Sequence, residues 1–116
     1  MSAGKLDLYA EQGATFSRKI TWKDSAGDPI DLTGATARMQ VRKTVRSTDI
    51  ALELTTENGR ITIASPTNGE IDLLVSAADM ENIADGAYRY DLEVAIGAAV
   101  TRLLEDVFTV SPEITR

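Results

Sequence analysis

Apolar and polar residues alternate along most of this chain. The clearest stretch is 88–96, where apolar residues occupy every even position and charged residues occupy most of the odd ones. A period of two is the pattern of a β-strand that buries one face and exposes the other to water. The same alternation predicts further strands at 14–22, 35–42, 50–54, 60–64 and 70–75, and a less regular one at 99–110.

Two places break the alternation. Arg18 takes a position on the apolar face of the strand at 14–22. In the last strand, two apolar residues, Leu103 and Val107, fall on the opposite face from Leu104, Phe108 and Val110. A β-bulge, or a strand that is buried on both faces, would explain this change of parity.

Turn-forming residues separate the strands. The loop at 23–29 is rich in Asp, Gly and Pro, and Gly97-Ala98 predicts a tight turn. Asn58-Gly59 and Asn68-Gly69 are typical of hairpins, because both residue types tolerate positive φ. We therefore expect the strands between 50 and 75 to form a three-stranded meander. Seven or eight short strands joined by such turns predict an all-β fold, an antiparallel sandwich, with 1–116 as a single domain.

Between the strands at 70–75 and 88–96 the pattern changes. Ser76-Ala77-Ala78-Asp79 has the spacing of a capping box and predicts a short helical turn near 77–83, which we interpret as the crossover between two sheets. Next, the segment 85–90 leads a turn into a strand. In immunoglobulin-like sandwiches the first tyrosine of such a corner, here Tyr88, bonds its hydroxyl back to the preceding loop. An immunoglobulin-like sandwich is therefore expected, with Tyr90 standing where antibody domains have a cysteine.

Composition removes most kinds of catalytic site. The 116 residues include no Cys and no His. Without these residues there is no disulfide, thiolate nucleophile, zinc–cysteine site or Ser-His-Asp triad. The 12 Lys and Arg residues against 18 Asp and Glu leave a net charge of -6, which argues against nucleic-acid binding. We predict that the protein is not an enzyme and has no catalytic residue, no cofactor and no metal site.

The sequence also argues against membrane contact. No apolar run approaches the about 20 residues that a spanning helix needs. The N-terminal residues include one lysine with no apolar stretch after it, which is not the pattern of a secretory signal. We therefore expect the chain to be made in the cytoplasm and used without Sec export.

Three kinds of site remain as alternatives. Calcium would need carboxylate clusters, and two loops offer them: Asp24, Asp28 and Asp31 in one, Asp79, Glu81 and Asp85 in the other. Neither has the spacing of a dedicated calcium loop, and Asp is common in turns. Glycan binding would need exposed aromatic residues, whereas Trp22 is expected in the core and only Tyr9 at the surface. A glycosidase would need a carboxylate pair in a cleft, which no motif marks.

Two groups of residues are candidates for protein–protein contact. Positive charge gathers on the strand at 35–42 and its exit loop, in a group made of Arg38, Arg42, Lys43 and Arg46 with the polar Gln40. It either faces an acidic partner or is a solvated face paired across strands with Asp and Glu. The second group is Leu6, Leu8 and Tyr9. Leu6, Leu8 and Ala10 alternate with Asp7 and Tyr9 before the first confident strand, which predicts an edge strand. Edge strands can accept a strand from a neighbouring chain.

Several segments, taken together, resemble one family of small proteins found in tailed bacteriophages and prophages. They are Gln12-Gly13-Ala14-Thr15-Phe16-Ser17, Ile20-Thr21-Trp22-Lys23-Asp24, 29–37 with Val41-Arg42, 69–73, Gly86-Ala87-Tyr88-Arg89-Tyr90-Asp91-Leu92 and 107–116. Their order is similar to the immunoglobulin-like N-terminal domain of phage baseplate upper proteins, over about 8 to 112. The resemblance implies a β-sandwich that docks into a tail or baseplate, and it carries over no single functional residue.

These observations lead to one functional hypothesis and one alternative. The hypothesis is a non-enzymatic structural or adaptor protein of a phage virion, located in the tail or baseplate and made in the bacterial cytoplasm. Its partners would be other virion or tail proteins, and we expect a homo-oligomer or another symmetric assembly, because tails are built by repetition. No nucleic acid or membrane is expected among its partners. The alternative is a carbohydrate-binding β-sandwich that contacts host surface glycans.

Overall fold

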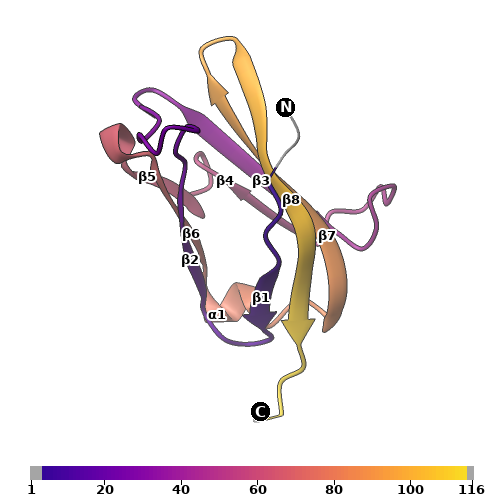
Figure 1. Ribbon diagram of the computed structural model, residues 1–116. Helices are drawn as coiled ribbons and strands as arrows, with labels where there is room; N and C mark the ends of the chain where they lie inside the picture. The colour runs from indigo at the N-terminus through magenta and orange to yellow at the C-terminus, as the bar shows by residue number, and fades with distance from the viewer. Residues whose placement is uncertain (1–3, 115–116) are drawn as a thin grey trace.

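Two facing β-sheets make up nearly all of the structure, a computed structural model that describes residues 4–114 (Figure 1). The five-stranded sheet has the order β1 (Leu8–Glu11), β8 (Ala99–Ser111), β7 (Gly86–Ile96), β3 (Thr36–Arg42) and β4 (Leu52–Thr55). The three-stranded sheet has the order β2 (Phe16–Thr21), β6 (Glu70–Val75) and β5 (Ile61–Ser65). Two short helical elements, α1 (Ala77–Met80) and the 3-10 turn η1 (Pro66–Asn68), lie between strands. The predicted all-β, immunoglobulin-like sandwich is confirmed.

The core lies between the sheets and follows the predicted alternation. In β7 every even position from Tyr88 to Val94 is buried, and in β3 the buried residues are Ala37, Met39 and Val41. The rings of Phe16 and Phe108 meet edge to face across the sandwich, with centroids 5.3 Å apart and planes at 66°. This is a favourable geometry for two aromatic rings, and it links β2 to β8.

Strand pairing differs from the prediction in two ways. The first strand, β1, runs parallel to β8, although an entirely antiparallel sandwich was expected. The second difference concerns 50–75: β4 pairs with β3 whereas β5 pairs with β6, so the predicted meander is wrong. Asn68-Gly69 does lie in a hairpin, between β5 and β6, with Gly69 at φ 68. Asn68-Gly69 therefore forms a hairpin turn between paired strands, whereas Asn58-Gly59 does not.

The turn at Asn58 explains why the chain changes sheet. Asn58 does not adopt positive φ, as a two-residue hairpin turn would require. Its Oδ1 instead accepts hydrogen bonds from the amides of Thr55 and Arg60, both at 3.0 Å. Its Nδ2 donates to the carbonyl of Glu53 at 3.1 Å. These bonds satisfy the backbone of a wider turn, which carries the chain from the five-stranded to the three-stranded sheet.

The crossover and the tyrosine corner form as predicted. The side chain of Ser76 accepts from the amide of Asp79 at 3.2 Å and begins α1, which leads from β6 to β7. The helix itself ends at Met80, three residues before the predicted boundary of 83. Tyr88 then donates its hydroxyl to the carbonyl of Ala84 at 2.6 Å, which fixes the loop before β7. That bond is the hallmark of the immunoglobulin-like corner.

A bulge in β8 explains the change of parity. Opposite β7, Leu92 pairs with Leu104 but Glu93 pairs with Arg102, so Leu103 is one extra residue. Beyond the bulge, Phe108 and Val110 are buried beside β1. The prediction of a bulge is therefore confirmed. The ends of the predicted domain, 1–3 and 115–116, and with them the last residues of the C-terminal tail, lie outside the described residues.

Candidate interaction surfaces

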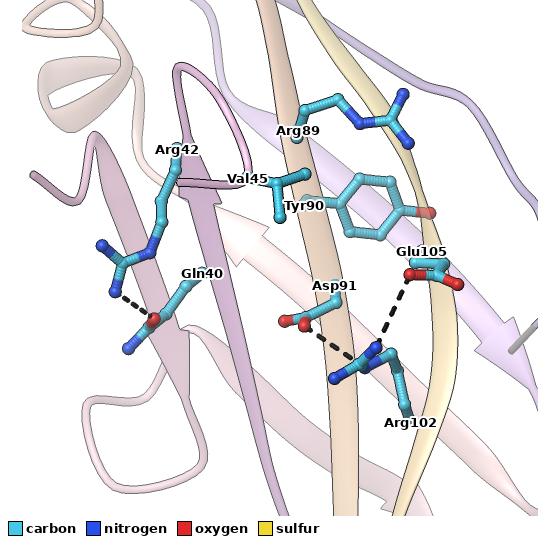
Figure 2. Close-up of a pocket in the computed structure, with 8 residues that line it drawn as sticks. All are labelled: Gln40, Arg42, Val45, Arg89, Tyr90, Asp91, Arg102 and Glu105. Carbon is cyan, nitrogen blue, oxygen red and sulfur yellow. Dashed lines mark hydrogen bonds and ion pairs between the residues drawn. The ribbon is translucent and has the colours of Figure 1, made fainter. Parts of the chain in front are cut away.

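The side of the five-stranded sheet that faces solvent is here called the outer face. It contains most of the basic group that was predicted to make protein–protein contacts. Arg38 Nη2 lies 3.8 Å from Glu93 Oε1. Gln40 Nε2 donates to Glu53 Oε2 at 2.6 Å, and Arg42 Nη2 donates to Gln40 Oε1 at 2.8 Å (Figure 2). The strand register creates these contacts, because Arg38 lies opposite Glu93 and Gln40 lies opposite Glu53. Acidic residues of β4 and β7 thus compensate the basic strand.

A second charged group continues across β7 and β8. Arg102 Nε lies 3.5 Å from Asp91 Oδ2, and its Nη1 lies 3.8 Å from Glu105 Oε2 (Figure 2). Lys5 Nζ also approaches Glu105, at 3.3 Å. Burial, and then the charge of Glu93, raise the pKa of Asp91 above its ordinary value, while Arg102 acts in the opposite direction. The outer face is therefore a mixed network of charges and not a positive patch.

The hollow drawn in Figure 2 lies on this outer face. Its volume is about 170 Å³, and its lining includes Val45, Asp91, Arg102 and Glu105. Pockets that bind small molecules usually measure about 300–1,000 Å³ and are largely apolar. Both carboxylates of the hollow bind Arg102, which is the arrangement of a structural ion-pair network. A surface of this shape suits contact with another protein better than enclosure of a small ligand.

The exit loop at 43–51 carries exposed apolar residues that the sequence analysis did not select. Val45 is 77% exposed and Ile50 is 42% exposed. Arg42 Nη1 donates to the carbonyl of Ser47 at 2.7 Å and holds this loop against β3. Arg46 is exposed within the loop. A single valine between charged residues was the available signal, but alternation alone says nothing about a loop.

The predicted edge strand is only partly available at the surface. β1 is an edge of the five-stranded sheet, as expected. Leu8 is 1% exposed and belongs to the core, so its side chain is not a surface contact, and Leu6 packs partly buried against that core. Tyr9 is 70% exposed. Of these three residues, Tyr9 alone has an exposed side chain, and the role of both predicted groups in binding stays a prediction.

Two acidic side chains of the first loop, Asp24 and Asp31, satisfy the loop's own backbone. Asp24 Oδ1 accepts from the amides of Ala26 at 2.9 Å and Asp28 at 3.0 Å. Asp31 Oδ1 accepts from the hydroxyl and amide of Thr33, and these bonds lower the pKa of Asp31. Within residues 4–114, no three Asp or Glu side chains gather as metal ligands would. The first loop therefore has the structure of side-chain-capped turns, and in the second loop Asp79 accepts from Arg60 Nη2 at 2.7 Å.

Aromatic residues are mainly internal. Over 4–114, Tyr9 is the one aromatic side chain that is exposed, and Trp22 packs partly buried against the core. In the same residues no helix is long and apolar enough to cross a bilayer. Sugar platforms are usually built from several exposed rings, so the surface does not favour the glycan alternative.

The comparisons with known proteins concern the fold. The chain matches no protein-family model and no curated protein. Its structure is similar to the N-terminal domain of phage TP901-1 ORF48, with 10% identity and a TM-score of 0.51, over 95% of this chain and 98% of that one. It is also similar to part of a candidate glycoside hydrolase from Bacteroides vulgatus, with 12% identity and a TM-score of 0.53, over 91% of this chain. The chain spans only 16% of that protein. At these identities, the likenesses show a shared β-sandwich fold.

Proposed function

We propose that this chain is a non-enzymatic structural or adaptor protein of a phage particle, associated with the tail or baseplate and acting through protein–protein contacts. The observation that carries the proposal is the likeness to the phage TP901-1 domain, which extends over almost the whole of both chains. The glycoside hydrolase shares the fold over a small part of its own length, so its activity is a weaker guide. The segments that resemble baseplate upper proteins point in the same direction.

The surface supports contact with proteins. The outer face is wide and polar, and its charges are already partly neutralised by one another. Such a face costs less to desolvate against a partner than isolated charges would. The exposed Tyr9 lies on β1, at one edge of this sheet, and the exposed Val45 lines the hollow on the outer face. Tyrosine is enriched at protein interfaces, and the exposed valine adds apolar surface that a partner would bury.

The test is the composition of purified particles. Phage particles are induced from a strain that encodes the chain, banded by density and analysed by quantitative mass spectrometry. The proposal expects the chain in the particle at a fixed number of copies relative to the tail proteins. Its absence from particles that contain the other tail proteins would overturn the proposal. Deleting the gene should leave capsids intact and tails defective or missing.

A matched pair of variants connects this test to the surface. Val45→Asp changes an exposed apolar side chain of the loop, and Thr67→Asp changes an exposed side chain at the opposite sheet. Both sites tolerate charge without disturbing the core. We expect Val45→Asp to lower incorporation into particles and Thr67→Asp to leave it unchanged. Equal incorporation of both variants would show that the loop is not part of the interface. It would not affect the question of whether the chain is a particle component, which the mass spectrometry decides.

A further inference from the structure

The N-terminal segment 4–12 is fastened to β8 at its two ends. The amide of Gly4 donates to Leu103 and the amide of Glu105 donates to Gly4, both at 2.9 Å. At the other end, β1 pairs with β8, and the amide of Gln12 donates to Ser111 at 3.0 Å. The register is the same throughout, since Gly4 pairs with Leu104 and Leu8 with Phe108. The whole segment thus follows one parallel ladder.

The middle of this ladder is interrupted at Leu6. In a continuous parallel ladder with this register, the amide of Val107 would donate to the carbonyl of Leu6. Val107 donates instead to Asp106 Oδ1 at 2.9 Å, and the Leu6 carbonyl accepts from the hydroxyl of Tyr90. Within residues 4–114 the amide of Leu6 has no backbone partner. Side chains therefore replace the central bonds between the segment and β8.

Two carboxyl groups meet at the interruption. A protonated Asp7 donates a hydrogen bond to Asp106, and this interaction is the largest cause of the raised pKa of Asp7. Arg89 of β7 is the cation that acts on Asp7, and Arg18 of β2 acts on the nearby Tyr90 hydroxyl. Two carboxylates that share a site cannot both ionise without repulsion. Near neutral pH the two carboxylates repel each other, only weakly because Asp7 is exposed to solvent.

Burial of apolar side chains supplies the attraction. Leu8 is 1% exposed and Ala10 is 6% exposed, and they lie beside Phe108 and Val110 on β8. Removing such apolar surface from water is favourable, roughly in proportion to the area buried. Every copy of the chain carries the same side chains in the same order. A second copy is therefore a fitting occupant of this edge of β8.

We propose that residues 4–11 form an exchangeable strand, which leaves β8 and is replaced there by residues 4–11 of a second copy of this chain. The interrupted ladder reduces the number of backbone hydrogen bonds that must break when the strand leaves, and the buried Leu8 makes replacement specific. Reciprocal exchange gives a closed dimer, whereas head-to-tail exchange gives a ring or a fibre. The inference goes beyond the proposed function and does not depend on it.

Disulfide trapping tests the exchange. The chain has no cysteine, so introduced thiols are unique. Tyr9 and Thr109 are Cα partners across β1 and β8. Neighbouring strands lie about 4.8 Å apart, within the about 4.4–6.8 Å between Cα atoms that a disulfide allows. One preparation carries Tyr9→Cys and the other Thr109→Cys, and the two are mixed, incubated and oxidised.

The expected result is a covalent heterodimer, formed several-fold more than in a mismatched mixture of Tyr9→Cys with Ala95→Cys. Ala95 is a half-buried residue of β7 and does not lie beside β1. Equal yields from the two mixtures would overturn the proposal. A chain that carries both Tyr9→Cys and Thr109→Cys, oxidised as a monomer, is locked and should remain monomeric. If this locked chain dimerises as readily as the unmodified one, the exchange is likewise refuted.

Discussion

Arg60 and Asp79 are joined by a charged hydrogen bond of 2.7 Å, from Nη2 to Oδ2. Arg60 also donates through Nη1 to the carbonyl of Glu53, at 2.8 Å. One side chain thus connects the end of β4, the start of β5 and the helical turn α1. Because these elements belong to different sheets, the contact braces the sandwich at the point where the chain crosses between them.

Removing this contact should change the dependence of stability on pH. The hydrogen bond from Arg60, and then its charge, lower the pKa of Asp79 below the ordinary 3.8. A lowered pKa in the folded state stabilises the fold above the ordinary pKa, and this stabilisation is lost as the pH falls through the folded value. In urea unfolding, Asp79→Asn should lower the midpoint at pH 7 but have little effect near pH 2. The exposed pair Lys19–Glu70 is the control, and Lys19→Ala should matter less at pH 7. Equal losses at both pH values would contradict the electrostatic account.

The tyrosine corner should contribute measurably to stability. Tyr88→Phe removes only the hydroxyl that donates to the carbonyl of Ala84. We expect the free energy of unfolding to fall by about 1 kcal/mol, the usual value for one such hydrogen bond. Tyr9→Phe removes an exposed hydroxyl and serves as the matched control. Chemical denaturation of both variants measures the difference, and equal values would show that the corner bond adds nothing.

Leu54 and Leu74 allow the same substitution to be compared at a buried and at an exposed position. Leu54 of β4 is fully buried, whereas Leu74 of β6 is 51% exposed on the opposite face of its strand from the core. Leu54→Ala should cost about 2–5 kcal/mol, because it removes buried contacts and leaves a cavity. Leu74→Ala should cost less than about 1 kcal/mol. A similar loss in both variants, measured by denaturant titration, would mean that the sheets do not enclose the core as described.

Gly69 and Gly27 allow the cost of a left-handed backbone to be distinguished from the cost of a steric clash at Cβ. Gly69 and Gly27 both have positive φ, at 68° and 87°. A Cβ on Gly69 would lie 2.4 Å from the carbonyl oxygen of Trp22, whereas one on Gly27 would meet nothing within 4 Å. Gly27→Ala should therefore cost about 1 kcal/mol for the left-handed backbone alone. Gly69→Ala should cost clearly more, since backbone atoms must move. Thermal unfolding of the two variants decides this, and the reverse order would refute it.

The N-terminal segment should bind most firmly in acid. Within this segment, the hydrogen bond of the Asp7 side chain with Asp106, and then burial, raise the pKa of Asp7 above the ordinary 3.8. A raised pKa stabilises the folded arrangement below the ordinary value, and the effect is lost as the pH rises through the folded pKa. Asp7→Asn should therefore slow amide exchange at 8–12 near pH 7, after correction for intrinsic rates, and change it little near pH 3. Glu11→Gln, an exposed change on β1, is the control. Faster exchange in Asp7→Asn at pH 7 would contradict the proposed repulsion.

Local patterns predicted which residues are buried. Alternation identified the core positions of β3 and β7 because a strand turns successive side chains to opposite faces. The capping serine Ser76 and the corner residue Tyr88 were equally recognisable, since each acts on backbone only three or four residues away. Such short-range features need no knowledge of which strands are neighbours.

Pairing between distant strands could not be predicted in the same way. The compensation of Arg38 by Glu93 depends on the register of β3 against β7, which single-strand alternation does not contain. The hairpin predicted at Asn58 is wrong because an asparagine can stabilise a turn in two ways, by adopting positive φ or by accepting backbone hydrogen bonds with its side chain. The parallel pairing of β1 likewise depends on β8, about a hundred residues later.

The parallel arrangement of β1 and β8 has a mechanical consequence. The chain enters the sandwich beside Leu104 and leaves it beyond Ser111, so entry and exit lie at opposite ends of one edge (Figure 1). Tension between the two ends runs along these strands and loads their hydrogen bonds in shear, all together and not one after another. The gap at Leu6 divides this shared load into two separate groups of bonds.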